Sequence, residues 1–114
     1  MQQQRWTVRV DHILAAIDKI QRYTAGMTFV EFASHQLAVD AVVRNFEVIA
    51  LASGGIPNDV IVRHRDIPWS TLRSFPIGAP IRPSDGRLEA IWNEIHNELP
   101  ALIPRLTAIR DHEA

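Results

Sequence analysis

The densest group of side chains that could do chemistry is the run from Arg63 to Asp66, which reads Arg-His-Arg-Asp. Two guanidinium groups could hold a phosphate, and an imidazole such as that of His64 can gain or lose a proton near neutral pH. The same run falls where a short helix is expected to end before Pro68, and cations at a helix C-terminus favour the helix dipole. We therefore interpret the run first as structural, and keep His64 as a candidate contact for phosphate or RNA.

Metal, thiol and phosphate-loop chemistry are not indicated by the sequence. The chain has no cysteine, which excludes disulfides, zinc–thiolate sites and cysteine catalysis. His12 and His96 do not belong to the paired histidine–glutamate patterns of helical metal sites, and none of the common phosphate-loop or nucleophile-elbow motifs occurs. We expect neither a metal ion nor a cofactor.

Arginine carries almost all of the positive charge, since Lys19 is the only lysine among the 12 cationic residues. Guanidinium groups match the geometry of phosphates, but the first interpretation of an arginine-rich composition is a GC-rich genome. The net charge of −1 at pH 7 argues against broad, sequence-independent coating of nucleic acid. Composition alone leaves both interpretations of the arginines open.

The elements that would position these groups are helices. Apolar side chains recur at helical spacing and predict three long helices, over about residues 6–24, 36–53 and 88–109, with breaks allowed at Pro100 and Pro104. A capping box at Thr28 and Glu31 predicts a short helix carrying Phe29 and Phe32. Prolines at the first turn predict two more, over about residues 57–62 and 68–75.

Residues 76–86, PIGAPIRPSDG, contain three prolines and two glycines and therefore predict a loop. Nothing alternates with a period of two, so no strand is predicted. The predicted fold is a single all-α domain over residues 1–114, a bundle of four to five helices. With no apolar run long enough for a membrane span and no signal peptide, we expect a cytoplasmic protein. Its small size favours pairing with a second copy.

Four segments, taken together, resemble the HepT-like toxins of the HEPN superfamily, and the resemblance covers about residues 10–106. They are IDKIQRYTAGMTFVEF (17–32), AVVRNFEVIALAS (41–53), GIPNDVIVRHRDIPWSTLRSF (55–75) and LEAIWNEIHNELPAL (88–102). The resemblance implies a small all-α protein that forms a homodimer and is encoded beside a minimal nucleotidyltransferase antitoxin, MntA. It also implies metal-independent ribonuclease activity.

The resemblance further implies a motif of arginine, four residues, histidine, one residue and tyrosine, directly after Phe75. In such a motif the histidine moves a proton at the RNA and the arginine stabilises charge on the phosphate. Two copies across the dimer axis would form one composite site. The antitoxin would silence that site by adding AMP to the tyrosine.

This chain departs from the pattern at that place. Counted without gaps, the three motif positions fall on Pro76, Ile81 and Pro83, and none of the three chemical groups is present. The block from Pro76 to Arg87 is either a natural remodelling or the product of two compensating frameshifts. A second departure is Ala50-Leu51-Ala52, where the resemblance implies Gly-Glu-Ala. No catalytic residue is therefore assigned at the family positions.

The remaining candidates for contact with phosphate or RNA are Arg44, Arg73, Arg82 and His64. Arg44 also lies three residues before Glu47, a spacing that allows an ion pair on the helix surface. Tyr23 is the only tyrosine and lies at the end of the first helix, so we expect no transfer of AMP to the family position.

Three hypotheses follow for the function. The first is a HepT-like protein that keeps the helical fold and the dimer surface but has lost catalysis, and that binds an MntA-like antitoxin or RNA. The second is an active ribonuclease toxin that uses substitutes such as His64, Arg44 or Arg73. The third is a helical protein-interaction module without catalysis.

Overall fold

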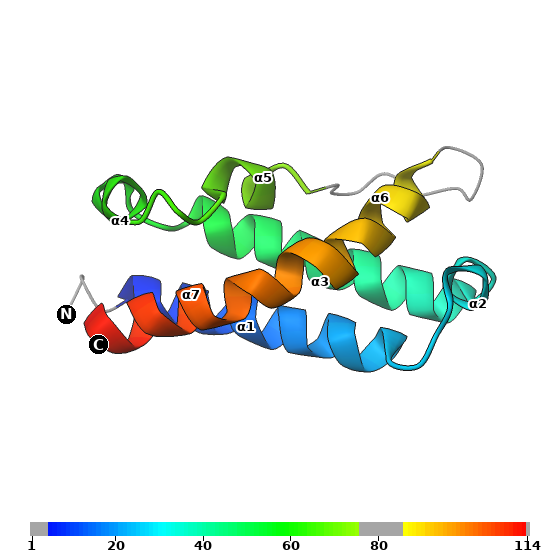
Figure 1. Cartoon of the computed structure of the whole chain (residues 1–114). Coiled ribbons are helices and arrows are strands. Elements are labelled where there is room, and N and C mark those ends of the chain that lie inside the picture. Colours follow the sequence, from blue (N-terminus) through cyan, green and yellow to red (C-terminus); the bar gives the residue numbers. More distant parts are fainter. Residues whose placement is uncertain (1–4, 76–85, 114) are drawn as a thin grey trace.

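The computed structural model describes residues 5–75 and 86–113, with the side chains of Arg5 and Glu113 excepted. Two long helices, α1 (Arg5–Thr24) and α3 (Gln36–Gly54), pack along each other. A third rod lies beside them and packs mainly on α1 (Figure 1). It consists of α6 (Arg87–Asn93), a π-helical turn η3 (Glu94–Glu98) and α7 (Leu99–Glu113).

Three short helices complete the described part: α2 (Phe29–Ala33), α4 (Asn58–Arg63) and α5 (Trp69–Arg73). Helices α4 and α5 fall within about two residues of their predicted bounds, as do α1 and α3, whereas the C-terminal rod runs to Glu113, four residues beyond its predicted end. The described residues contain no strand, which confirms the all-α class. They form six helices when α6, η3 and α7 are counted as one rod, rather than four or five, because α2, α4 and α5 are separate elements.

The core lies where the predicted apolar stripes meet. Ile13, Ile17 and Ile20 of α1 are completely buried, and Phe46 and Ile49 of α3 are buried against them. Burying such a side chain contributes about 1.5–3 kcal/mol, so this contact between α1 and α3 is a major source of stability. Truncating Phe46 to alanine would cost about 3–5 kcal/mol.

Local hydrogen bonds explain where α2 and α3 begin. The backbone N–H of Thr28 donates to Oε1 of Glu31 at 2.8 Å, and the N–H of Glu31 donates back to Oγ1 of Thr28 at 3.1 Å, so the predicted capping box is confirmed. Gly26, with φ of +76°, supplies the left-handed turn after α1. His35 caps α3, because its Nδ1 accepts from the N–H of Ala38 at 3.1 Å.

The widened turn η3 lies just before Pro100, where the sequence allowed a break. Proline at this position has no N–H for the carbonyl of His96, and its ring crowds that carbonyl. A turn with the wider π spacing relieves the crowding without ending the helix. The rod therefore continues through Pro100 and Pro104 into α7. Within the described chain, no helix combines the length and the apolar character that crossing a membrane needs.

Candidate functional site

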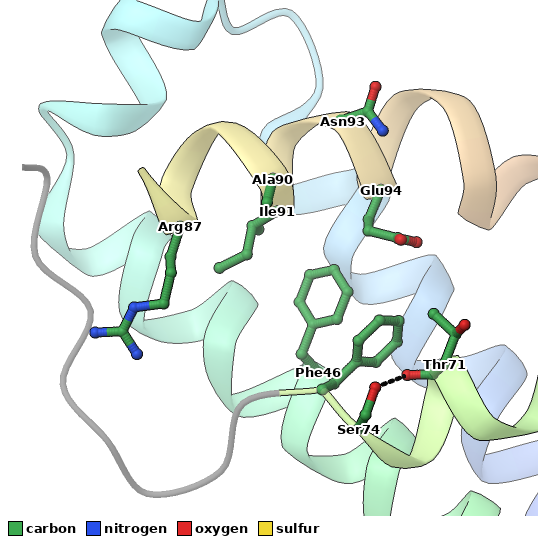
Figure 2. Close-up of a pocket in the computed structure, with 9 residues that line it drawn as sticks. Phe46, Thr71, Ser74, Arg87, Ala90, Ile91, Asn93 and Glu94 are labelled. Atoms are coloured by element: carbon green, nitrogen blue, oxygen red, sulfur yellow. Dashed lines mark hydrogen bonds between the residues drawn. The ribbon is translucent and has the colours of Figure 1, made fainter. Parts of the chain in front are cut away.

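A pocket of about 490 Å³ opens between α5 and α6, and its lining includes Phe75 and Arg87, which lie on either side of the undescribed residues 76–85 in the sequence (Figure 2). We call it the α5–α6 pocket. It is lined by Phe46, Thr71, Ser74, Phe75, Arg87, Ala90, Ile91, Asn93 and Glu94. The motif positions Pro76, Ile81 and Pro83 and the candidate Arg82 lie outside the described residues.

One wall of the pocket is a single face of the C-terminal rod. Arg87, Ala90, Ile91 and Glu94 follow the spacing i, i+3, i+4, i+7, which places all four on the same side of a helix. Figure 2 shows Arg87 at one end of this face and Glu94 at the other, with Ala90 and Ile91 between them. The small side chain of Ala90 leaves the middle of the wall open.

The opposite wall comes from α3 and from the end of α5. The rings of Phe46 and Phe75 meet edge to face, with centroids 4.7 Å apart and planes at 89°. Both rings are buried and form an apolar floor. Ser74 and Thr71 lie on the rim, and Oγ of Ser74 donates to the carbonyl of Thr71 at 2.9 Å. The pocket therefore has an apolar floor, a hydroxyl-bearing rim and one charged group at each end.

The carboxylate of Glu94 is the electrostatically perturbed group of the site. Burial raises the pKa of Glu94 above its usual value, and the nearby charge of Glu98 raises it further. Glu94 also lines a second pocket of about 340 Å³, together with Glu98 and Arg105. Perturbed carboxyl groups in clefts are candidate functional residues. Sequence reasoning missed this one because Glu94 lies beside the core stripe and belongs to no known motif.

The three described candidates from the sequence lie in three different environments. Arg44 is exposed on α3, with Nη1 3.8 Å from Oε2 of Glu47, which confirms the predicted pair. Arg73 reaches the end of α3, where Nε donates to the carbonyl of Ser53 at 3.2 Å and Nη2 to that of Ile56 at 3.5 Å.

His64 follows α4 as its C-terminal cap, and its carbonyl accepts a 3.0 Å hydrogen bond from Nε1 of Trp69. Trp69 is buried. Of the neighbours of His64, Arg63 pairs with Asp59 at 3.6 Å, and the carbonyl of Asp66 accepts a 3.0 Å bond from Nη1 of Arg105. These contacts favour the structural interpretation of the run.

The candidates do not converge on one point. Arg44 lies nine residues before Ser53 on α3, which is about 13 Å along the helix axis, and the guanidinium of Arg73 lies at Ser53. None of Arg44, His64 and Arg73 lines the α5–α6 pocket. Their contact with phosphate or RNA stays a prediction.

All five histidines belong to the described chain, and none of them lines the α5–α6 pocket. His35 caps a helix, and the ring of His96 packs against that of Trp92, with centroids 4.2 Å apart and planes tilted by 58°. Tyr23 is half exposed at the end of α1 and does not line the pocket either. Within residues 5–75 and 86–113, no three histidine, aspartate or glutamate side chains are grouped so that they could hold a metal ion.

Comparison with known proteins points to one family. The family described as "Ribonuclease HepT-like" matches residues 13–75. "Probable ribonuclease HepT" from Thermococcus cleftensis is 26% identical over 108 residues, which cover 89% of this chain and 92% of the relative. "Putative RNase MJ0127" from Methanocaldococcus jannaschii is 29% identical over 97 residues, which cover 85% of this chain and 80% of the relative.

A further relative from Methanocaldococcus jannaschii, "Gamma-glutamylcyclotransferase and putative RNase MJ0434", is 32% identical over 105 residues. The match covers 91% of this chain but only 47% of that relative, so the chain corresponds to about half of it. No solved structure matches the chain.

Proposed function

The chain belongs to the ribonuclease HepT-like family, and from this premise we propose that it is the toxin-type component of a toxin–antitoxin pair that has lost the family's metal-independent ribonuclease catalysis. The proposal includes a homodimer in the cytoplasm. It also includes an MntA-like nucleotidyltransferase as the antitoxin partner and RNA as a bound ligand.

The observation that carries the loss of catalysis is that none of the five histidines of the chain lines the α5–α6 pocket. The segment from Pro76 to Arg87 contains no histidine and no tyrosine, and the five histidines of the chain lie elsewhere. The isoleucine and prolines at the motif positions can neither transfer a proton nor bind a phosphate. The match to the family also ends at Phe75, the last residue before this segment.

Exposed apolar side chains on α3 support the homodimer. Leu37 and Leu51 are 77% and 61% exposed, far more than leucines of a core. Leu37, Arg44 and Leu51 follow each other at intervals of seven residues, so they form one stripe along the outside of α3. A second copy would cover this stripe.

An RNA-cleavage assay with a growth assay tests the proposal. We expect no cleavage of total RNA by the purified chain in the presence of a chelator, and no growth arrest on induction. The "Probable ribonuclease HepT" relative, assayed in parallel, controls for the conditions.

His64→Ala separates the first hypothesis from the second. Chelator-resistant cleavage that disappears in His64→Ala would contradict the loss of catalysis and would support an active ribonuclease with substitute residues. Purification with a co-expressed nucleotidyltransferase tests the antitoxin, and intact-mass spectrometry should show no added AMP on Tyr23.

A further inference from the structure

The outer stripe of α3, made of Leu37, Arg44 and Leu51, is symmetrical about its one charged residue. Each leucine lies seven residues from Arg44, which is about 10 Å along the helix axis. Both leucines are largely exposed. If a second copy packs on this stripe in the antiparallel direction, with the two-fold axis at Arg44, Leu37 of each copy meets Leu51 of the other. One contact then covers all four leucines.

The two flanks of the stripe differ in character. In an α-helix, positions i−4 and i+3 lie on one side of residue i, and positions i−3 and i+4 lie on the other. One flank of Arg44 therefore carries Asp40 and Glu47, and the other carries the half-buried Ala41 and Val48. A two-fold axis perpendicular to two antiparallel helices brings like flanks together. The apolar flanks of the two copies then pack on each other, while the charged flanks gather two carboxylates from each copy.

The guanidinium of Arg44 is placed to compensate for these carboxylates. The Arg44 side chain is 68% exposed, and its Nη1 lies 3.8 Å from Oε2 of Glu47, which is too long for a hydrogen bond. Arg44 can therefore turn to another carboxylate without losing a hydrogen bond to Glu47. In the antiparallel register, Glu47 of the partner subunit lies opposite Ala41. That position is three residues, or about 4.5 Å along the axis, from Arg44 and within reach of an arginine side chain.

We propose that Arg44 binds the carboxylate of Glu47 of the partner subunit, and that this ion pair and its symmetry mate set the antiparallel register of the homodimer. The inference rests on the homodimer of the proposed function and specifies its geometry. A second copy is favoured as the occupant because the stripe is complementary to itself, since leucine meets leucine and arginine meets glutamate. Arg44, a candidate contact for RNA in the sequence, is thereby assigned to recognition of a second copy.

Two charge reversals test the crossed pair. Arg44→Glu leaves only carboxylates on the charged flank, and Glu47→Arg makes each Arg44 face an arginine. Like charges across an interface oppose association, so each variant should raise the dissociation constant of its homodimer about a hundredfold. Sedimentation equilibrium measures this constant for each variant and for the unaltered chain.

An equimolar mixture of the two variants should form a heterodimer. Every glutamate at positions 44 and 47 of one copy then faces an arginine of the other, so the heterodimer should be at least as tight as the unaltered homodimer. Its formation also shows that both variants are folded. The matched control is Arg22→Glu on α1, where Nε of Arg22 forms an exposed pair with Oδ2 of Asp18 at 3.0 Å. That reversal should leave the dissociation constant unchanged.

The outcomes separate this inference from the proposed function. If both variants form homodimers as tight as that of the unaltered chain, or if their mixture gives no heterodimer, the crossed pair is refuted. An equal loss of affinity in Arg22→Glu also refutes it, because the effect would then be one of overall charge. A monomeric unaltered chain refutes the homodimer and this inference with it. RNA cleavage in the assay of the previous subsection would refute the loss of catalysis and leave the crossed pair standing.

Discussion

Glu94 carries its negative charge at a cost to the folded state. Burial and the charge of Glu98 raise its pKa, and within the described residues no hydrogen bond or ion pair compensates for this. Arg73 shows the opposite case, since its guanidinium is exposed yet donates to two backbone carbonyls of other elements. At the scale of single residues, the group with a shifted pKa is therefore Glu94 in the α5–α6 pocket. Arg73, which the sequence offered as a contact for phosphate, instead connects α5 to the end of α3.

Glu94→Gln should stabilise the protein near neutral pH. Because the pKa of Glu94 is raised on folding, its ionised form destabilises the folded state, and this penalty grows as the pH rises through the folded-state value. Below the usual value of 4.5 the carboxyl is protonated in both states and the penalty is absent. We expect a higher melting temperature for the variant at about pH 7 and a vanishing difference at about pH 3.5, measured by circular dichroism. Glu89→Gln, on the same helix, should show no such trend.

Ser53→Ala should also stabilise the protein. Ser53 is fully buried on α3, and in the described part of the chain its hydroxyl has no hydrogen-bond partner. An unsatisfied buried hydroxyl costs about 1–3 kcal/mol, so alanine should raise the free energy of unfolding by about 1 kcal/mol in urea titrations. The control is Thr24→Ala, whose buried hydroxyl donates to the carbonyl of Ile20 at 2.9 Å. That change should lower the stability; a gain there as well would contradict the explanation.

At the scale of elements, the end of α3 is where several segments meet. Gly54 is the last residue of the helix, and Gly55 is its C-terminal cap. Gly55 has no side chain, and the guanidinium of Arg9 from α1 packs against it where a Cβ would lie. Arg73 from α5 covers the carbonyls of Ser53 and Ile56 on the same helix end. Positive groups at this end also complement the helix dipole.

Arg73→Ala should therefore loosen α5 from α3. Loss of two hydrogen bonds from an exposed guanidinium should lower the free energy of unfolding by about 1 kcal/mol. Arg73→Lys keeps the charge but cannot make the forked contact, and it should recover only part of the loss. If Arg73→Ala weakened RNA binding without any change in stability, Arg73 would contact the ligand and would not stabilise the packing of α5 on α3.

Helical periodicity was enough to predict most elements and the residues at their core. The stripe Ile13, Ile17, Ile20 is buried as predicted, since a helix with one apolar face must bury it. The wider turn η3 could not be predicted, because the sequence signals a break at Pro100 but not how it is accommodated. The α5–α6 pocket could not be predicted either, because it depends on how α5 packs across from Arg87 and Glu94. The only signal in the sequence was the helical spacing of Arg87, Ala90, Ile91 and Glu94, which indicates that these four side chains share one face of the C-terminal rod.

At the scale of the whole molecule, the outer stripe of α3 is the surface that the proposed dimer would cover. Leu37→Asp combined with Leu51→Asp should convert a dimer into a monomer, because two buried carboxylates would oppose their own symmetry mates. Light scattering coupled to size exclusion measures the mass directly. The control Val8→Asp changes an exposed apolar residue of α1 and should leave the mass unchanged. A monomeric unaltered chain would contradict the homodimer.

The start of α1 and the end of α7 lie at the same end of the molecule, away from α2 (Figure 1). Nη1 of Arg110 near the end of α7 lies 3.0 Å from Oδ1 of Asp11 near the start of α1, which holds them together. A short linker could therefore join the termini in a circular permutant. If new ends were opened between Pro80 and Ile81, inside the block that departs from the family, the permutant should still assemble α1, α3 and the rod. Such a chain would allow that block to be exchanged for an intact motif on either side of the cut.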